Sequence, residues 1–295
     1  MKRLLLTASI AALMLSACAP KSEAPSEGAA AGETAGAEAV VASENAPLPV
    51  DLGSPIFEEE TEDYTIRAVV DSRIAAFQSA LAEDLMTSAK GQLEAFKADA
   101  IRDGAAAREQ AAATGQESWF RPYSMEIRFT QSAQEGDVIG IEQFTMVDTA
   151  GAHPNYILTG LVHERSDEYP VSLDTVVTDM AGYGASLKKH LIEAKSERAY
   201  DDAARANVPA EVEEILGSDA DAASKFGTNF TLAPSTEAGK FGGITVLFSP
   251  YDAGPYAEGS YEITIPASEL SGKLTPAWEA RFGGEPNLPA EDVQQ

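Results

Sequence analysis

The sequence predicts an α+β fold: a disordered tether followed by two small domains in contact, each an antiparallel sheet covered by helices. Three observations lead to this prediction. From Ala19 to about Ser54 the chain is rich in Ala, Gly, Glu, Pro and Ser and has almost nothing to bury, so it cannot offset its chain entropy. The remainder alternates between strand-like and helix-like apolar spacing. That order, a strand and a helix followed by further strands, occurs twice, with a boundary near Arg165.

In the first half, apolar residues fall at period two from Tyr64 to Val70, which predicts a strand. A long helix is then expected from Ser72 to about Gln110, with Gly91 and Gly104 as candidate break points. Its apolar stripe comprises Phe77, Leu81, Leu85, Ala89, Leu93, Phe96 and Ala100. The acidic run 58–63 just before the strand is interpreted as a solvated flank.

Three further strands are expected in this half, at Met125–Thr130, Val138–Val147 and Tyr156–Val162. The first alternates apolar and polar residues, which is typical of a strand with one wet face. Residues 134–137 read Gln-Glu-Gly-Asp and predict a hairpin turn before the second of these strands.

The second half begins with a helical region from Leu173 to about Ala199, with Gly182 and Gly184 as candidate interruptions. Pro209 is expected to open a short acidic helix, because proline is favoured in the first turn. The strands expected next are Asn229–Leu232, Gly243–Phe248 and Tyr261–Ile265. The predicted domains are therefore 55–165 and 166–272, followed by a tail at 273–295.

The N-terminus has the order of a secretory leader: Lys2 and Arg3, then the apolar run from Leu4 to Leu15. That run is shorter than the roughly 20 residues needed to span a bilayer. The string Leu-Ser-Ala-Cys ending at Cys18 resembles the bacterial lipobox, which implies cleavage after residue 17, lipid on Cys18 and a linker over 18–54. Since residue 19 is not aspartate, the resemblance favours the outer membrane, facing the periplasm.

Composition restricts the chemistry further. Cys18 is the only cysteine, so disulfides and thiolate sites are excluded from the folded part. The formal charge is −26, and removal of Lys2 and Arg3 with the leader makes it −28. Nucleic-acid binding is excluded because it needs a basic surface. A basic protein partner would instead be attracted, although the charge could also serve solubility alone.

Motifs typical of catalysis are scarce. There is no Gly-x-Ser-x-Gly elbow and no phosphate-binding loop. The Ser-x-x-Lys string at Ser186 lacks a Lys-Thr-Gly partner. A zinc site from His153 and His163 would need the two side chains to converge, and along one strand they would lie about 33 Å apart. We therefore expect no metal, no cofactor and no catalytic residue, although a carboxylate pair among the 47 acidic residues stays open.

Two segments carry a resemblance to a known family: Thr149-Ala-Gly-Ala-His-Pro-Asn155, and Phe248 to Gly259 with its Pro-Tyr and Gly-Pro-Tyr-Ala strings. They resemble a two-part domain of unknown function found in the extracellular half of lysozyme-sensing anti-sigma factors and beside peptidoglycan deacetylase domains. The similarity extends over about Phe57 to Leu270. Ala150 and Pro154 stand where the family has glycine.

The resemblance implies a non-catalytic binding module in the cell envelope, for a basic lysozyme-like hydrolase or for peptidoglycan. Rigid aromatic residues on a fixed turn make a contact surface of low entropy cost. The candidate contacts are Tyr251, Tyr256, His153 and Asn155, with Asp252 and Glu258 as carboxylates that steer the approach. A structural loop that joins two strands would explain the same residues. A cell-wall hydrolase with a carboxylate pair, or an envelope scaffold that binds neither target, would also be compatible with the sequence.

Overall fold

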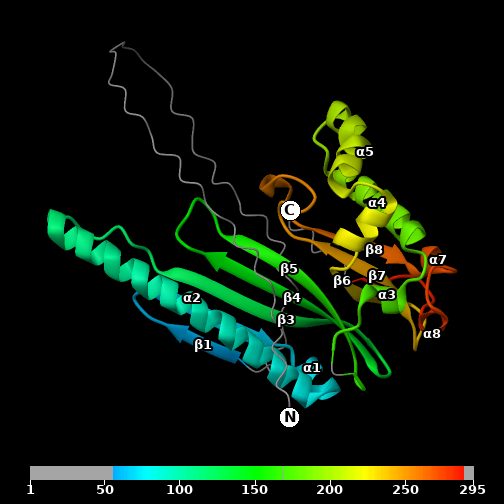
Figure 1. The fold of residues 1–295 in the computed structure, drawn as a ribbon, viewed down its shortest axis with the longest axis horizontal. Coiled ribbons are helices and arrows are strands. Elements are labelled where there is room, and N and C mark those ends of the chain that lie inside the picture. The colour runs from blue at the N-terminus through cyan, green and yellow to red at the C-terminus, as the bar shows by residue number, and fades with distance from the viewer. Residues whose placement is uncertain (1–55, 168, 289–295) are drawn as a thin grey trace. The chain divides into compact units, whose positions relative to one another are not determined.

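The computed structural model describes residues 56–167 and 169–288. Cys18, the expected leader at 1–17 and the expected linker at 18–54 lie outside these residues. No helix of the described part is both long and apolar enough to cross a membrane. The fold is α+β, as the sequence predicts, with one sheet of five strands and one of three (Figure 1).

The five-stranded sheet has the order β1-β2-β3-β4-β5. Its strands are β1 (Ile56–Glu60), β2 (Tyr64–Val70), β3 (Tyr123–Glu135), β4 (Val138–Asp148) and β5 (Asn155–Glu164). All neighbours are antiparallel except β2 and β3, which are parallel. A parallel pair needs a long crossover, and here the intervening helices provide it.

The interpretation of the acidic run as a solvated flank was wrong for residues 58–60, because they belong to strand β1. Glu58, Glu59 and Glu60 pair with Arg67, Ile66 and Thr65 of β2. An edge strand tolerates this composition, since charged side chains there discourage pairing with another chain.

Two helices connect β2 to β3: α1 (Ser72–Phe77) and α2 (Ser79–Thr114). The break falls at Gln78, and α2 continues through both Gly91 and Gly104, where a break was expected. At Gly104 a Cβ atom would lie 2.1 Å from Oδ1 of Asp63, so this glycine permits close packing instead of ending the helix. Figure 1 shows α2 lying along the sheet, where it packs on β2 and β3.

The three-stranded sheet has the order β6-β7-β8 and is antiparallel. Its strands are β6 (Phe230–Pro234), β7 (Phe241–Phe248) and β8 (Tyr261–Pro266). The helices of this half are α3 (Leu173–Val176), α4 (Met180–Arg198), α5 (Asp202–Leu216), α6 (Asp219–Asp221), α7 (Ala267–Leu270) and α8 (Pro276–Glu279). A π-helical turn spans Ala222–Phe226 and a 3-10 turn spans Tyr256–Glu258.

Two helix boundaries differ from the sequence prediction. The interruption expected at Gly182 and Gly184 falls at residues 177–179, where the Asp179 side chain caps α4. Helix α5 begins at Asp202, and Pro209 lies inside it. The carboxylate of Asp201 accepts a hydrogen bond from the N–H of Ala204, and this cap fixes the start of the helix.

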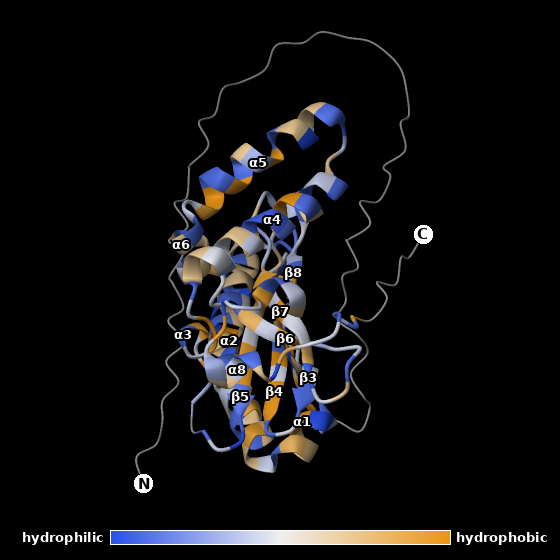
Figure 2. Cartoon of the chain, turned by 90° about the vertical axis from the view of Figure 1, so that its right-hand side faces the viewer, coloured by the Kyte–Doolittle hydropathy of each residue, from blue (hydrophilic) through white to orange (hydrophobic). Residues whose placement is uncertain are grey.

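The described residues form two apolar cores, the second of which also includes Ala133, Val138 and Val162 of the five-stranded sheet. One lies between α2 and the five-stranded sheet and includes Ile66, Leu93 and Ile127. The other lies under α4 and α5 and includes Tyr183 and Leu187. In Figure 2 helix α5 alternates between hydrophobic and hydrophilic residues, as expected of a helix that covers a core with one side.

Residues 273–288, which the sequence pattern set apart as a tail, also pack on the second core. The Trp278 side chain is only 2% exposed, and Leu274 is buried as well. Leu274 forms a β-bridge with Val177, and Phe282 forms another with Phe241. The described part of this segment therefore belongs to the folded unit.

The two sheets contact each other through β6, which touches β3, β4 and β5. At Gly160 of β5, a Cβ atom would lie 2.3 Å from main-chain atoms of Phe230. The hydroxyl groups of Ser132 and Thr231 are 2.6 Å apart across the same contact. The loops at one end of this contact carry the residues that the sequence singled out.

Candidate functional site

The two segments that carry the family resemblance meet in space. The ring of His153, in the loop between β4 and β5, stacks on the ring of Tyr256, with centroids 3.8 Å apart and planes at 22°. The Tyr256 hydroxyl donates to the carbonyl oxygen of Pro154 at 2.6 Å. The Tyr251 ring lies 5.6 Å from that of Tyr256. We call His153, Pro154, Tyr251 and Tyr256 the aromatic junction.

The aromatic junction is accessible to solvent. His153 and Pro154 are exposed, and Tyr256 is half-buried. Tyr251 is 61% exposed, which is high for a large aromatic side chain. Burial, with smaller contributions from Tyr156 and Tyr251, raises the pKa of the Tyr256 hydroxyl, so this group is a neutral donor near pH 7.

Backbone strain is concentrated in the same two loops. In the described part of the chain, Ala150 and Tyr251 are the two residues other than glycine with a positive φ, 60° and 77°. Such a backbone costs an L-residue roughly 1–2 kcal/mol. The Ala150 N–H donates to the side chain of Asp148 at 2.8 Å, which helps to hold the turn. Glycine would adopt the positive φ of Ala150 without this cost.

Asp252 is accessible to solvent and supports the Tyr251–Tyr256 loop through a hydrogen bond. Its carboxylate accepts from the N–H of Ser249 at 2.7 Å, and the Ser249 hydroxyl accepts from the N–H of Leu158 in β5 at 3.0 Å. Burial raises the pKa of Asp252. The carboxylate therefore supports the turn, and its part in steering a partner stays a prediction.

Glu258 anchors the other end of the loop. Its carboxylate accepts from Nζ of Lys195 and from the hydroxyl of Tyr261, each at 2.6 Å. Burial opposes ionisation, but these hydrogen bonds outweigh it and hold the pKa of Glu258 below its usual value. The Lys195 side chain is only 3% exposed and also donates to the carbonyl oxygen of Ala253 at 2.7 Å. A steering part for Glu258 likewise stays a prediction.

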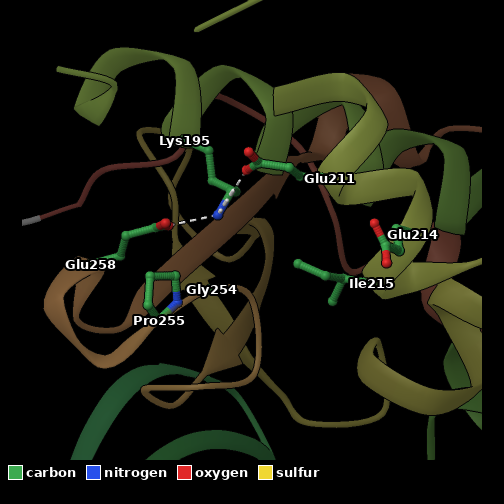
Figure 3. A pocket seen from close by; sticks show the side chains of 7 residues that line it. All are labelled: Lys195, Glu211, Glu214, Ile215, Gly254, Pro255 and Glu258. Carbon is green, nitrogen blue, oxygen red and sulfur yellow. Dashed lines mark hydrogen bonds and ion pairs between the residues drawn. The ribbon is translucent and has the colours of Figure 1, made fainter. Parts of the chain in front are cut away.

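A small hollow of about 320 Å³ lies behind this anchor (Figure 3). Its lining comprises Lys195, Glu211, Glu214, Ile215, Gly254, Pro255 and Glu258. Figure 3 shows the Lys195 side chain extending toward the carboxylates of Glu258 and Glu211. Gly254, Pro255 and Glu258 of the loop thus line the hollow, next to Tyr256 of the aromatic junction in the sequence.

Asn155 begins β5 directly after the aromatic junction and is exposed. It pairs with Val147 of β4. Its main chain thereby holds the end of the loop that carries His153 and Pro154. A contact between its side chain and a partner stays a prediction.

Residues that the sequence pattern did not single out extend the surface from the aromatic junction onto the sheet. Tyr156 stacks on Phe144 with centroids 5.8 Å apart, and the guanidinium of Arg128 lies 4.6 Å above the Phe144 ring. A Cβ atom on Gly259 would lie 3.5 Å from the Tyr156 hydroxyl, so this row adjoins the Tyr256 loop. The available signal was the period-two alternation of β4: Ile139 and Ile141 enter the α2 core, so Phe144 lies on the opposite face of the sheet.

The site offers rigid aromatic rings and hydrogen-bonding groups but no set of metal ligands. No group of three or more metal-binding side chains occurs among residues 56–167 and 169–288. His163, considered above as a zinc ligand, lies buried in β5, and burial lowers its pKa.

Comparison with known proteins finds a family match for the C-terminal part of the site. Residues 179–268 match the family described as "Protein of unknown function (DUF3298)". A DUF3298 family structure from Bacteroides fragilis NCTC 9343 is 19% identical, covers 75% of this chain and 92% of its own, and has a TM-score of 0.49. One from Pseudomonas aeruginosa PAO1 is 16% identical, covers 81% and 98%, and has a TM-score of 0.45. No curated protein matches the chain.

The matched segment includes Tyr251 and Tyr256, whereas His153 precedes it. The aromatic junction therefore joins the matched domain to the region before it. The resemblance noted in the sequence is confirmed to this extent, as a domain of unknown function. Residues 179–268 of this chain match the DUF3298 family model.

Proposed function

We propose that the protein is a lipoprotein of the cell envelope and that its folded part is a binding module without catalytic activity. Lipid on Cys18 would anchor it, in the outer membrane and facing the periplasm. The aromatic junction would contact the partner, together with the adjoining row of Tyr156, Phe144 and Arg128.

The observation that carries this proposal is the stack of the exposed His153 ring on the half-buried Tyr256 ring. A purely structural role would be served by burying both rings, yet two loops about 100 residues apart leave His153 and Tyr251 exposed, and each loop contains a strained backbone position. Rigid aromatic side chains with polar ends are enriched at the centres of binding surfaces, because little entropy is lost when they are covered.

The charge favours a basic protein, such as a lysozyme-like hydrolase, as the partner. A surface of net charge −28 after removal of the leader attracts a cationic protein and accelerates the encounter. Peptidoglycan is the other target that the family resemblance suggests, and the aromatic row could stack on sugar rings. We propose a basic protein as the partner, and peptidoglycan is the comparison in the test.

The test uses residues 18–295 with Cys18→Ser, so that no lipid is attached. We expect hen egg-white lysozyme to bind at low ionic strength and to bind much more weakly as salt rises. Insoluble peptidoglycan is tested in parallel by co-sedimentation. Failure to bind lysozyme at low salt would remove the basic-protein proposal, and sedimentation with peptidoglycan alone would replace it with the second target.

A cell-wall hydrolase is the second candidate, and one observation favours it. Burial, aided by the charge of Glu262, raises the pKa of Glu142 to about 7. Paired carboxylates in which one holds a proton near neutral pH are typical of glycoside hydrolases. This candidate predicts release of soluble sugar from peptidoglycan, lost in Glu142→Gln. Absence of turnover by the unaltered chain would reject it.

A further inference from the structure

The two borders of the five-stranded sheet differ in how their main chain is hydrogen bonded. At the β5 border, the side chain of Asn229 donates to the carbonyl oxygen of Leu158, and the Ser249 hydroxyl accepts from the N–H of the same residue. Further along, the N–H of Val171 donates to the carbonyl oxygen of Val162 at 2.7 Å. Groups with which β5 could pair to another strand are therefore occupied by its own chain.

The opposite border, β1, lacks such partners. Strand β1 ends the strand order and pairs with β2 (Figure 1). Among residues 56–167 and 169–288, no main-chain hydrogen bond reaches β1 from any element other than β2. Alternate N–H and C=O groups of an edge strand point away from its neighbour, so those of β1 have no main-chain partner within the described part of the chain.

Strand β1 is held in place from the side of α2. The Nζ atom of Lys97 lies 2.9 Å from the carboxylate of Glu59, which also accepts from the hydroxyl of Tyr64. The Nζ atom of Lys90 lies 5.0 Å from the centre of the Phe57 ring. Because these contacts order β1 in advance, the entropy lost on adding a strand to its outer edge is reduced.

The other face of β1 is acidic. Ile56, Glu58 and Glu60 alternate with the residues that face α2, and all three are exposed. Arg67 of β2 is the cross-strand neighbour of Glu58, but it also lies 4.0 Å from Glu126. The negative charge along this edge is therefore only partly balanced.

Charge decides which kind of strand fits the edge. A second copy of β1 would place glutamates beside glutamates, and like charges on adjacent strands are destabilising. Residues 22–55 of the chain contain six acidic residues and no Lys or Arg, so they would meet the same repulsion. A strand with basic side chains at alternate positions would instead be attracted to Glu58 and Glu60.

We propose that β1 is a docking edge for an extended basic segment of another protein, which adds to the five-stranded sheet as a sixth strand. Main-chain hydrogen bonds to β1 supply the affinity, and the glutamates select for positive charge. The same glutamates reject neutral and acidic strands, which protects the edge from non-specific pairing. This edge lies across the sheet from β5, so it is a second surface, and its existence does not rest on the proposed role of the aromatic junction.

The experiment uses residues 18–295 carrying Cys18→Ser and a blocked, fluorescently labelled peptide, Lys-Val-Lys-Val-Lys-Val. Two further peptides of the same sequence and charge carry N-methyl groups, one on its lysine amides and the other on its valine amides. Alternate amides of a strand face the same neighbour, so only one of these two peptides loses its hydrogen bonds to β1. We expect fluorescence anisotropy to show that this peptide binds at least about tenfold more weakly than the other.

Matched variants of the protein locate the site. Glu58→Gln combined with Glu60→Gln removes the exposed carboxylates of β1 and should weaken binding of the unmethylated peptide about fivefold. Glu117→Gln combined with Glu197→Gln removes two exposed carboxylates elsewhere and changes the net charge equally. At about 0.1 M salt, charges more than about 10 Å apart are screened, so this control should bind within about twofold of the parent.

Amide exchange measured by NMR then shows whether a strand has been added. Every second amide within residues 56–60 should gain protection when the peptide binds. Equal binding of the two methylated peptides, no binding of the unmethylated peptide, or protection gained outside β1 alone would overturn the proposal. A dimer that protects β1 without peptide would also overturn it. Lysozyme is not used, so the outcome is separate from that of the binding test above.

Discussion

The side-chain amide of Asn229 pairs with the main chain of β5 as a neighbouring strand would. Its oxygen accepts from the N–H of Gly160 at 2.8 Å, and its nitrogen donates to the carbonyl oxygen of Leu158 at 3.0 Å. The same nitrogen donates to the carbonyl oxygen of Leu247 in β7 at 2.7 Å. One residue thus satisfies part of the free edge of the first sheet and ties it to the second.

Replacement of this amide should weaken the contact between the sheets. Asn229→Ala leaves partly buried main-chain groups on two strands without partners, at a cost of about 2–3 kcal/mol in the free energy of unfolding. Denaturant unfolding measures this loss of free energy, and Asn207→Ala on α5 is the control. A loss below about 0.5 kcal/mol would show that Asn229 does not hold the sheets together.

Ala150 should store strain that glycine would release. Its φ of 60° lies in the left-handed region that glycine adopts freely. We expect Ala150→Gly to stabilise the fold by up to about 1 kcal/mol, since greater freedom of the unfolded chain offsets part of the gain. Ala152→Gly in the same loop, where no positive φ occurs, is the control and should not be stabilising. Destabilisation by Ala150→Gly would argue against strain at this turn.

The buried ammonium group of Lys195 should be needed to hold the Tyr256 loop in place and to keep the fold stable. Lys195→Met removes the partner of Glu258 and leaves its half-buried carboxylate unpaired, which should cost about 3 kcal/mol. Lys189→Met is the control: that lysine is 54% exposed and pairs with Glu269 at 2.7 Å, so less than about 1 kcal/mol is expected. Chemical denaturation measures the free energy of unfolding of both variants. Similar losses of stability in the two would contradict the anchoring role of Lys195.

Two glycines inside α2 should respond in opposite ways to alanine. No atom lies within 4 Å of a Cβ placed on Gly91, whereas one placed on Gly104 would meet Asp63 at 2.1 Å. Gly91→Ala should therefore stabilise the helix by about 0.5–1 kcal/mol. Gly104→Ala should displace Asp63, which binds Arg108 at 2.7 Å, and destabilise the fold. The melting temperatures of the two variants should move to opposite sides of the parent value.

Much of the fold follows from the sequence because regular apolar spacing reports which face of an element is buried. The spacing in residues 64–70 and 138–147 located β2 and β4 almost to the residue. It could not reveal β1, whose glutamates lie on an edge strand, or the continuity of α2 at Gly104, which depends on Asp63 from a distant segment. Register between strands was likewise not encoded locally, so the parallel pairing of β2 and β3 became visible only in the fold.

The candidate site was predicted in part. The loop segments containing His153, Tyr251 and Tyr256 could be chosen from the sequence, but their direct contact depends on the packing of the two sheets. The inward orientation of Glu258 depended on Lys195 in a separate helix.

The aromatic junction is the proposed binding surface, and titration calorimetry with hen egg-white lysozyme at low ionic strength tests that role most directly. Tyr256→Ala removes the ring that joins both loops and should weaken binding at least about tenfold, as truncation of a central aromatic contact does. Tyr200→Ala is the control, since Tyr200 is 89% exposed at the turn between α4 and α5, and should bind as the parent does. Equal affinity of Tyr256→Ala and the parent, or no binding by the parent, would contradict the role of the junction.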